Sequence, residues 1–346
     1  MEIDRQTLYN QLALVAPGLS TGREVLEQSS CFVFADDTVT TFNNEIACRA
    51  SLELGGITGA VVAEPLLNML DKLPDDTLNI SVEDGDAPKL VVKGKRRKQR
   101  VKMETETLLP VDMVPMPDED DWAELPEEFC QGVPIVCEVT NKKHNKFPMQ
   151  CVHFTGTHIE ASDNVQMARV RMVLPVEGDF LVRATTIKSV AELQPEWAYC
   201  PGGDWAHFAT ASGCIISCRI HNLEYPNIDQ LVDMALGDQV TLPAQLADII
   251  ERAQVMSAKT TEATEKVTVF LRPGGMRVVG GGIFGDFEEI VDVAYEGRSV
   301  RFLIAPTVLR DLSKAHNTVH LGERVLRAES PSITFVTATS DFKAKD

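Results

Sequence analysis

The chain has 346 residues, of which 44% are hydrophobic and 24% charged, and its formal net charge is -18 at pH 7. This length predicts two or three domains, and the composition is that of a chain able to bury its own core. No apolar run approaches the roughly 18 residues that span a bilayer, and the first residues lack the features of a signal peptide, so we expect a cytoplasmic protein without membrane contact. The acidic balance excludes generalised nucleic-acid binding, and any DNA contact needs a locally basic surface.

Motifs that would carry chemistry are weak in this sequence. The cysteines are scattered without a C-x-x-C pair, which predicts small buried residues rather than a disulfide framework. Cys214, Cys218 and His221 have metal-ligand chemistry but no fourth ligand nearby. Gly280–Gly285 satisfies the dinucleotide pattern, yet a strand-like segment follows it where a helix is needed, so we expect a hairpin turn. We therefore expect no enzyme activity, no metal and no cofactor.

The most informative feature is self-similarity with a period of about 115 residues, in which a helix, strands, a second helix and further strands recur. In the first third, Leu8, Leu12 and Val15 share one helical face, and Pro17 ends that helix. A turn is expected at Asp36-Asp37. The expected helices cover residues 5–16 and 64–73, and the expected strands are Cys31–Phe34, Asn44–Leu52, Asn79–Val82, Lys89–Val92 and Arg100–Thr105.

The same order is expected twice more. The second third predicts helices over Glu127–Thr140 and Thr185–Leu193, and strands at Val152–Phe154, Ile159–Ala161, Val165–Val173, Phe180–Ala184, Trp205–Thr210 and Cys214–Ile220. The last third predicts helices over Leu242–Ala258 and Pro306–Lys314, and strands at Val267–Leu271, Arg277–Val279 and Ile290–Tyr295. Linkers at Pro110–Leu125 and Tyr225–Gln239 divide the chain into domains at 1–116, 117–238 and 239–346.

At this point the chain resembles the β sliding clamp of bacterial DNA polymerase III, or a phage-encoded relative, over nearly its whole length. The resemblance is carried by Leu19–Arg23, Ile159–Asn164, Met167–Arg169, Tyr225–Ile228, Val291–Gly297 and Ile333–Val336. It implies an α+β fold of three clamp-type domains, each with two helices packed on antiparallel sheets. Two chains would close head to tail into a ring around double-stranded DNA, with a DNA polymerase and a clamp loader as partners.

The resemblance also implies three sites. The apolar peptide pocket would be formed by Pro148, Ser162, Asn164, Met167, Pro226, Leu231, Phe335 and Val336, although Ser-Asp-Asn at 162–164 replaces the usual Thr-Asp-Gly and Met167 replaces a leucine. DNA contacts would fall on Arg23, Lys142, Lys143 and Lys146. The homodimer interface would join Val101 and Met103 of one chain to Val255 and Met256 of the other.

A tether that holds DNA by encircling it needs weak attraction without sequence reading, and cations on the expected inner helices would supply it. The candidates are Lys72, Lys188, Arg252, Lys259, Arg310 and Lys314. The basic run Lys93–Arg100 is interpreted as a solvated hairpin turn, because no aromatic residue is interleaved with it. Two alternatives stay open. One is a structural or assembly protein, such as a virion component, built from repeated β-rich domains. The other is an enzyme whose site has no recognisable motif.

Overall fold

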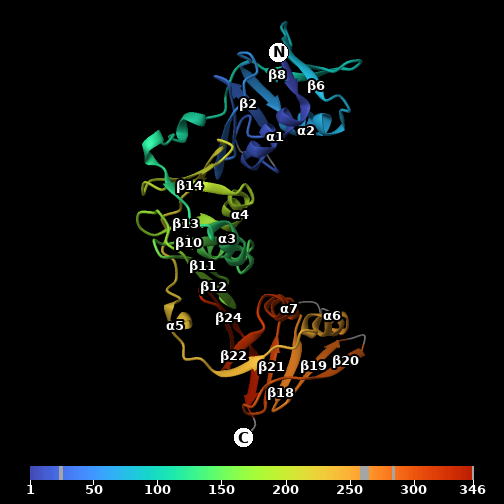
Figure 1. Cartoon of the computed structure of the whole chain (residues 1–346), viewed down its shortest axis with the longest axis vertical. Helices are drawn as coiled ribbons and strands as arrows, with labels where there is room; N and C mark the ends of the chain where they lie inside the picture. Colours follow the sequence, from blue (N-terminus) through green and yellow to red (C-terminus); the bar gives the residue numbers. More distant parts are fainter. Residues whose placement is uncertain (23–25, 258–264, 283–284, 345–346) are drawn as a thin grey trace. The chain divides into compact units, whose positions relative to one another are not determined.

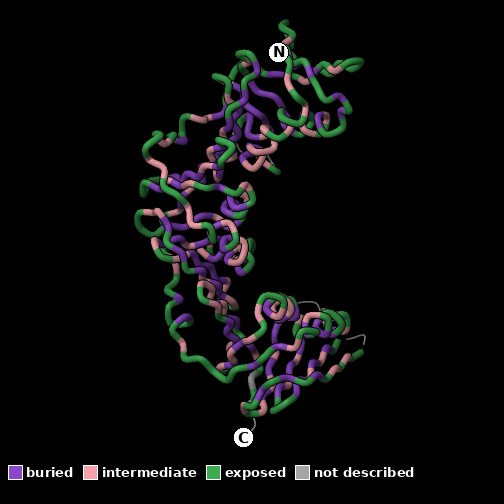
Figure 2. The backbone as a smooth tube through the Cα atoms, in the orientation of Figure 1, coloured by how far each residue is buried: buried purple, intermediate pink, exposed green. Residues whose placement is uncertain are grey.

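A computed structural model of the chain describes residues 1–22, 26–257, 265–282 and 285–344 (Figure 1). The described residues pack into two compact units. Unit 1 comprises Met1–Glu138, Gln150–Ile159 and Met172–Glu224, and unit 2 comprises Val139–Met149, Glu160–Arg171 and Tyr225–Asp346. Figure 2 shows that buried residues follow the strands and one side of the helices in each unit. Among the described residues, no helix is long and apolar enough to span a bilayer.

One order of elements occurs three times along the chain, which confirms the repeat predicted from the sequence. Repeat 1 consists of β1 (Glu2–Asp4), α1 (Arg5–Val15), β2 (Cys31–Ala35), β3 (Thr38–Phe42), β4 (Ile46–Ser51), β5 (Gly59–Val62), α2 (Ala63–Lys72), β6 (Thr77–Glu83), β7 (Lys89–Lys93) and β8 (Lys98–Glu104). Short 3-10 turns η1 (Ala16–Gly18), η2 (Val111–Met113) and η3 (Glu119–Asp121) lie beside this framework.

Repeats 2 and 3 have the same order. Repeat 2 consists of β9 (Ala123–Glu124), α3 (Phe129–Glu138), η4 (Phe147–Gln150), β10 (Cys151–Phe154), β11 (His158–Ser162), β12 (Gln166–Arg171), β13 (Phe180–Arg183), α4 (Ala184–Glu192), β14 (Pro195–Tyr199), β15 (Trp205–Thr210) and β16 (Ile215–Arg219). After α5 (Asp229–Val232), repeat 3 consists of β17 (Asp238–Thr241), α6 (Leu246–Met256), β18 (Val267–Arg272), β19 (Gly275–Gly282), β20 (Gly285–Asp292), β21 (Val300–Ile304), α7 (Pro306–Ala315), β22 (Thr318–Gly322), β23 (Val325–Glu329), β24 (Ile333–Ala338) and β25 (Ser340–Ala344).

Strand pairing repeats as well as element order. The first strand of each repeat pairs antiparallel with the strand that follows the second helix, as β1–β6, β9–β14 and β17–β22. Adjacent repeats are joined strand to strand: β4 pairs with β16 in unit 1, and β12 pairs with β24 in unit 2. In repeat 3 the strand equivalent to β4 and β12 is β20, and it ends its sheet order. In repeat 1 the strand equivalent to β16 and β24 is β8.

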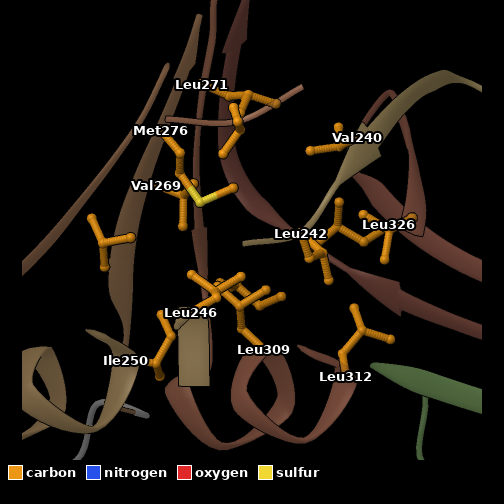
Figure 3. Packing of buried hydrophobic residues seen from close by; sticks show 14 of the residues in the cluster. Val240, Leu242, Leu246, Ile250, Val269, Leu271, Met276, Leu309, Leu312 and Leu326 are labelled. Atoms are coloured by element: carbon orange, nitrogen blue, oxygen red, sulfur yellow. The ribbon is translucent and has the colours of Figure 1, made fainter. Parts of the chain in front are cut away.

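The helices form where the periodicity predicts them. Asp4 caps α1, since its Oδ1 accepts a hydrogen bond from the Thr7 N–H at 2.7 Å. The α6 face predicted from Leu246, Ile249 and Ile250 is fully buried, and Figure 3 shows it packed with α7 beneath the strands of repeat 3. Each repeat therefore buries one helix pair against its own sheets.

Several strand predictions differ from the structure, and β1, β9, β17, β22, β23 and β25 have no predicted counterpart. β3 and β14 were not predicted; Asp36-Asp37 is the turn between β2 and β3, with both residues in the left-handed region. The strand expected at Ile290–Tyr295 begins earlier, at Gly285. The prediction placed its start too late because adjacent charged residues mask the alternation of apolar and polar positions. The hairpin expected at the glycine run is confirmed, since Gly282 lies opposite Gly285 in the β19–β20 ladder.

Candidate partner pocket and nucleic-acid surface

An apolar cluster in unit 2 brings together two of the residues predicted for the peptide pocket. Met167 on β12 lies directly opposite Val336 on β24 in the antiparallel ladder. Both side chains are buried, and Ile228 and Val232, at either end of the α5 segment, pack onto them. The sequence analysis missed Ile228 and Val232 because α5 has four residues, too few for helical periodicity to be visible. We call Met167, Ile228, Val232 and Val336 together the α5 cluster.

A buried charge bridge holds α5 against the sheet. One guanidinium nitrogen, Arg169 Nη2, lies 2.6 Å from a Glu160 carboxylate oxygen and 2.6 Å from Asp229 Oδ1 at the start of α5. Burial lowers the pKa of Arg169, but its hydrogen bonds and charge interactions with the two carboxylates outweigh that effect and raise it. The bridge therefore positions the α5 cluster through a charge that stays ionised.

The turn between β11 and β12 carries two more of the residues predicted for the pocket, Ser162 and Asn164. Ser162 Oγ donates to the Gln166 carbonyl at 2.9 Å, and the Asn164 N–H donates to Ser162 Oγ at 3.3 Å. Asn164 has a φ of 71°, a conformation in which asparagine is one of the few tolerated replacements for glycine. Its side-chain nitrogen lies 2.9 Å from His144 Nε2. Asparagine at position 164 therefore accommodates this backbone conformation and adds a contact to His144.

The other predicted pocket residues are placed differently. Phe335 lies on the opposite face of β24 from Val336 and packs against the repeat 3 core, because successive strand residues point to opposite faces. Phe335 is therefore not part of the α5 cluster. Pro226 and Leu231 are exposed beside the α5 cluster, with Leu231 37% exposed, and Pro148 is half-buried in η4.

The predicted DNA-binding lysines are available to solvent. Lys142, Lys143 and Lys146 are exposed in the segment between α3 and η4, which is shaped by hydrogen bonds from the Lys143 N–H to Asn141 Oδ1 and from the Lys146 N–H to His144 Nδ1, both at 3.0 Å. Lys72 and Lys188 are exposed on α2 and α4. Within the described part of the chain, none of these five lysines forms a salt bridge. Arg23 and Lys259 lie outside the described residues.

Carboxylates pair with the predicted DNA-binding cations on the helices of repeat 3. Arg252 pairs with Glu289 at 2.8 Å, Arg310 with Asp311 at 2.8 Å and Lys314 with Glu251 at 3.3 Å. The exposed helix faces also carry acids of their own: Glu64, Asp71, Glu192, Asp248, Glu251 and Asp311. The exposed helix faces therefore carry both signs of charge. Among the predicted DNA-binding cations that the structure describes, those without a salt bridge lie on α2, on α4 and in the loop after α3.

A shallow pocket of about 260 Å³ lies in unit 1, beside the described residues that precede Arg23. It is lined by Ser20, Thr21, Gly22, Asn43, Glu45, Arg183, Thr185 and Thr186. Glu45 lies 3.4 Å from Arg183 and 3.3 Å from His221. Burial raises the pKa of this carboxyl, but the hydrogen bonds from His221 and Arg183 outweigh burial and lower it. The pocket therefore combines a fixed ion pair with hydroxyl groups.

The predicted interface residues lie on two elements that belong to different units. Val101 is half-buried on β8, and Met103 is 2% exposed, opposite Val61 of β5 in its own repeat. Val255 is 72% exposed near the end of α6, and Met256 is half-buried beside it. Met103 therefore contributes to the core of repeat 1, whereas Val255 is a large apolar side chain in solvent.

These features define a class of protein: three copies of one α+β module, each with a helix pair, joined edge to edge through their sheets. The chain is similar in structure to the DNA polymerase III β subunit from Pseudomonas aeruginosa, with a TM-score of 0.79, 17% identity and coverage of 98% of this chain and 99% of that one. A putative DNA polymerase III β subunit from Eubacterium rectale gives a TM-score of 0.82 at 14% identity, over 98% of this chain and 99% of that one. The β subunit from Thermotoga maritima gives 0.81 at 16% identity, over 98% of both chains.

The chain therefore has the fold of the bacterial DNA polymerase III β sliding clamp. No protein-family profile matches the sequence, and no curated protein matches it. The chain is therefore similar to these proteins in fold, while its sequence identity to them is low.

Proposed function

We propose that the protein is a DNA sliding clamp: a ring subunit, without catalytic chemistry of its own, that encircles double-stranded DNA and tethers a DNA polymerase. The observation that carries this proposal is the threefold repetition of one module together with two strands, β8 and β20, whose equivalents join adjacent repeats. β20 ends its sheet order, and β8 pairs with β5 only at Met103 and Glu104 in the described ladders. A head-to-tail homodimer that paired β20 of one protomer with the preceding part of β8 in its partner would cover both strands.

The repeat supplies the register for that pairing. Arg49 of β4 lies opposite Ile215, and Arg169 of β12 lies opposite Thr334. Counting from the preceding turns, the residue equivalent to Arg49 and Arg169 is Glu288, three positions after Gly285. Counting in the same way, the residue equivalent to Ile215 and Thr334 is Lys98, the first residue after the β7–β8 turn. Glu288 of one protomer would therefore face Lys98 of its partner.

The same register brings opposite charges together along the strand. Asp286 would face Arg100, two positions from the Glu288 and Lys98 pair, and like-sign contacts would be avoided. Lys98 and Arg100 now pair with Glu83 at 2.8 and 2.6 Å, on an exposed surface where such pairs contribute little. The basic run at 93–100, interpreted as a solvated turn, would then form one side of the dimer interface, opposite the acidic residues of β20. On the other face, the half-buried Phe287 and Val101 and the exposed Val255 would supply apolar contact.

DNA would contact exposed lysines of the first two repeats and of the loop after α3. Lys72, Lys188 and the loop lysines would attract phosphates without reading bases, as a sliding tether requires. The surrounding excess of carboxylates would discourage binding elsewhere. The α5 cluster would receive a short apolar peptide from a polymerase or a clamp loader, with the micromolar affinity, about -8 kcal/mol, that suits exchanging partners.

Negative-stain imaging of the full chain, with sedimentation at the same concentration, tests this proposal. We expect a dimeric annulus with a central opening. A solid particle, or a stable monomer at high concentration, would contradict it and would favour a structural or assembly protein. A second measurement follows retention on a nicked circular plasmid in the presence of a clamp loader. Release upon linearisation is expected of a topological tether, and unchanged retention would indicate ordinary surface binding.

A further inference from the structure

A groove of about 630 Å³ lies on the sheet of repeat 3, in unit 2. Its lining includes Phe270 of β18, Arg277 of β19, Ile290 of β20, Arg301 of β21 and Lys343 of β25. Phe270 alternates with Val269 and Leu271, which are buried in the repeat 3 core, so its ring projects from the face of the sheet away from α6 and α7. The groove is therefore separate from the α5 cluster.

The lining of this groove differs in charge from the rest of the protein. It contains four cations, namely Arg272, Arg277, Arg301 and Lys343, and no carboxylate, although the chain has a net charge of -18. Ile290, which is 57% exposed, and the half-buried ring of Phe270 supply apolar surface. The volume lies within the range of about 300 to 1,000 Å³ that is usual for ligand sites.

Two of the arginines lie over the ring of Phe270. The guanidinium carbon of Arg277 lies 4.1 Å from the Phe270 ring centroid, and that of Arg301 lies 5.8 Å from it. The N–H groups of a guanidinium that is stacked on a ring point outward in the guanidinium plane. They can therefore bind a carboxylate through a bidentate pair of hydrogen bonds. Phe270 therefore serves as a platform that orients two arginines.

Two neighbouring acids occupy part of this binding capacity. Glu288 lies 3.5 Å from Arg277, and Asp341 lies 2.5 Å from Arg301. These are exposed pairs, which contribute little and can exchange for another carboxylate. In the described part of the chain Arg272 forms no salt bridge, so the groove retains an excess of positive charge.

We propose that this groove docks a linear peptide in which a large apolar side chain is flanked by carboxylates. The apolar side chain would lie against Ile290, and the carboxylates would pair with Arg272 and Arg301. Single-stranded nucleic acid fits less well, because stacking of bases needs open aromatic faces and Arg277 covers the ring of Phe270. The groove shares β20 with the proposed dimer interface, and Arg277 pairs with Glu288 of that interface. The peptide site itself uses Arg272, Arg301 and Ile290 and does not require the ring.

The test measures fluorescence anisotropy of a labelled hexapeptide with two central leucines flanked by glutamates, titrated with the full-length protein. We expect saturable binding that weakens at high salt. The double variant Arg272→Ala/Arg301→Ala is expected to bind at least about tenfold more weakly, since each lost charged hydrogen bond contributes substantially. Ile290→Ser is expected to weaken binding by a smaller factor.

A matched control removes two exposed cations elsewhere, Lys89→Ala/Lys93→Ala on β7, and should leave the affinity within about twofold if local contacts rather than net charge decide it. A peptide with glutamines in place of glutamates should bind at least about tenfold more weakly. Equal loss of binding in both double variants would overturn the proposal. So would absence of saturable binding, or a single-stranded oligonucleotide that binds as tightly as the peptide and loses affinity in the same variants.

Discussion

Asn44 and Asn164 occupy equivalent positions in repeats 1 and 2, with φ values of 74° and 71° at the turns that precede β4 and β12. In both turns the side chain before the asparagine, Asn43 or Asp163, accepts hydrogen bonds from the two N–H groups that follow. These strands join neighbouring repeats, so the turn that sets their direction is built in the same way twice. The repetition extends from topology to the geometry of single residues.

The left-handed backbone at Asn164 makes a direct prediction. Asn164→Gly should be tolerated, because glycine adopts this conformation without a steric penalty. Asn164→Val should destabilise unit 2 by about 1–3 kcal/mol, because a β-branched side chain at positive φ is strained. Thermal unfolding of both variants measures the difference. If Asn164→Val unfolds at the wild-type temperature, the turn does not impose this conformation in solution.

Buried His207 predicts a pH dependence of unit 1. Its side chain is 1% exposed, and its Nδ1 lies 2.8 Å from Ser217 Oγ. Burial lowers its pKa from 6.5 to about 4. Above pH 6.5 the imidazole is neutral in both the folded and unfolded states, but between about pH 6.5 and 4 the unfolded chain takes up a proton that the folded chain refuses. Folding stability therefore falls as the pH drops through this window, by up to about 3 kcal/mol.

The measurement uses tryptophan fluorescence, because Trp122, Trp197 and Trp205 all lie in unit 1. His207→Gln keeps a hydrogen-bonding group toward Ser217 but cannot take up the proton. Urea unfolding of the wild type and this variant at about pH 7 and pH 5 isolates the contribution of the histidine, since other acid-sensitive groups are common to both. An equal pH dependence in the two proteins would show that His207 is not the source.

The sequence predicted the repeat, the helices and the main strands because each helix has a continuous apolar face and each module has the same order. It missed β3, whose residues Thr38–Phe42 continue directly from a two-residue turn and were merged into one longer connection. β14 was missed because it begins at Pro195. Proline is rare inside strands, and only the structure shows that this one is the first residue of its strand, where proline is tolerated. Short elements next to turns carry too little periodic signal.

The candidate pocket was predicted in part. Met167 and Val336 face each other because their strands pair, and alternation then sends Phe335 to the opposite face. The correct face of a strand depends on which register forms, and the sequence does not contain that information without the partner strand. The bridge from Arg169 to Glu160 and Asp229 joins residues up to 60 positions apart, a separation at which no local pattern is informative.

Removing the Arg169 bridge should release α5. In Arg169→Ala, Glu160 would remain buried, with its side chain 5% exposed, and would lose its ion pair with Arg169. Breaking a buried pair in this way costs about 3–5 kcal/mol, whereas Arg252→Ala, which removes an exposed pair with Glu289, should cost less than about 1 kcal/mol. Hydrogen exchange at residues 228–233 and thermal unfolding check the two variants. Comparable effects would mean that the bridge is not the anchor of α5.

Peptide binding at the α5 cluster should be separable from folding. Leu231→Glu changes an exposed side chain, so it should leave the unfolding temperature near that of the wild type while strongly reducing stimulation of a polymerase. Met167→Ala removes a side chain that is 1% exposed and should destabilise unit 2 by about 2–5 kcal/mol. The double variant Met167→Ala/Leu231→Ala should lose stimulation and remain dimeric. Unchanged stimulation by Leu231→Glu would place the polymerase contact elsewhere.

Ring closure through β8 and β20 predicts a charge swap. Glu288→Lys would place two lysines opposite each other across the interface, and Lys98→Glu would place two glutamates there, so each single variant should dissociate at least about tenfold more readily in sedimentation. The double variant Glu288→Lys/Lys98→Glu restores opposite charges and should recover the dimer. Glu288 also pairs with Arg277 within its own repeat, so Arg277→Ala serves as a control for loss of that contact.

If both single variants remain as dimeric as the wild type, or if the double variant is no better than either single one, this register is wrong. Any dimer would then be built on other surfaces.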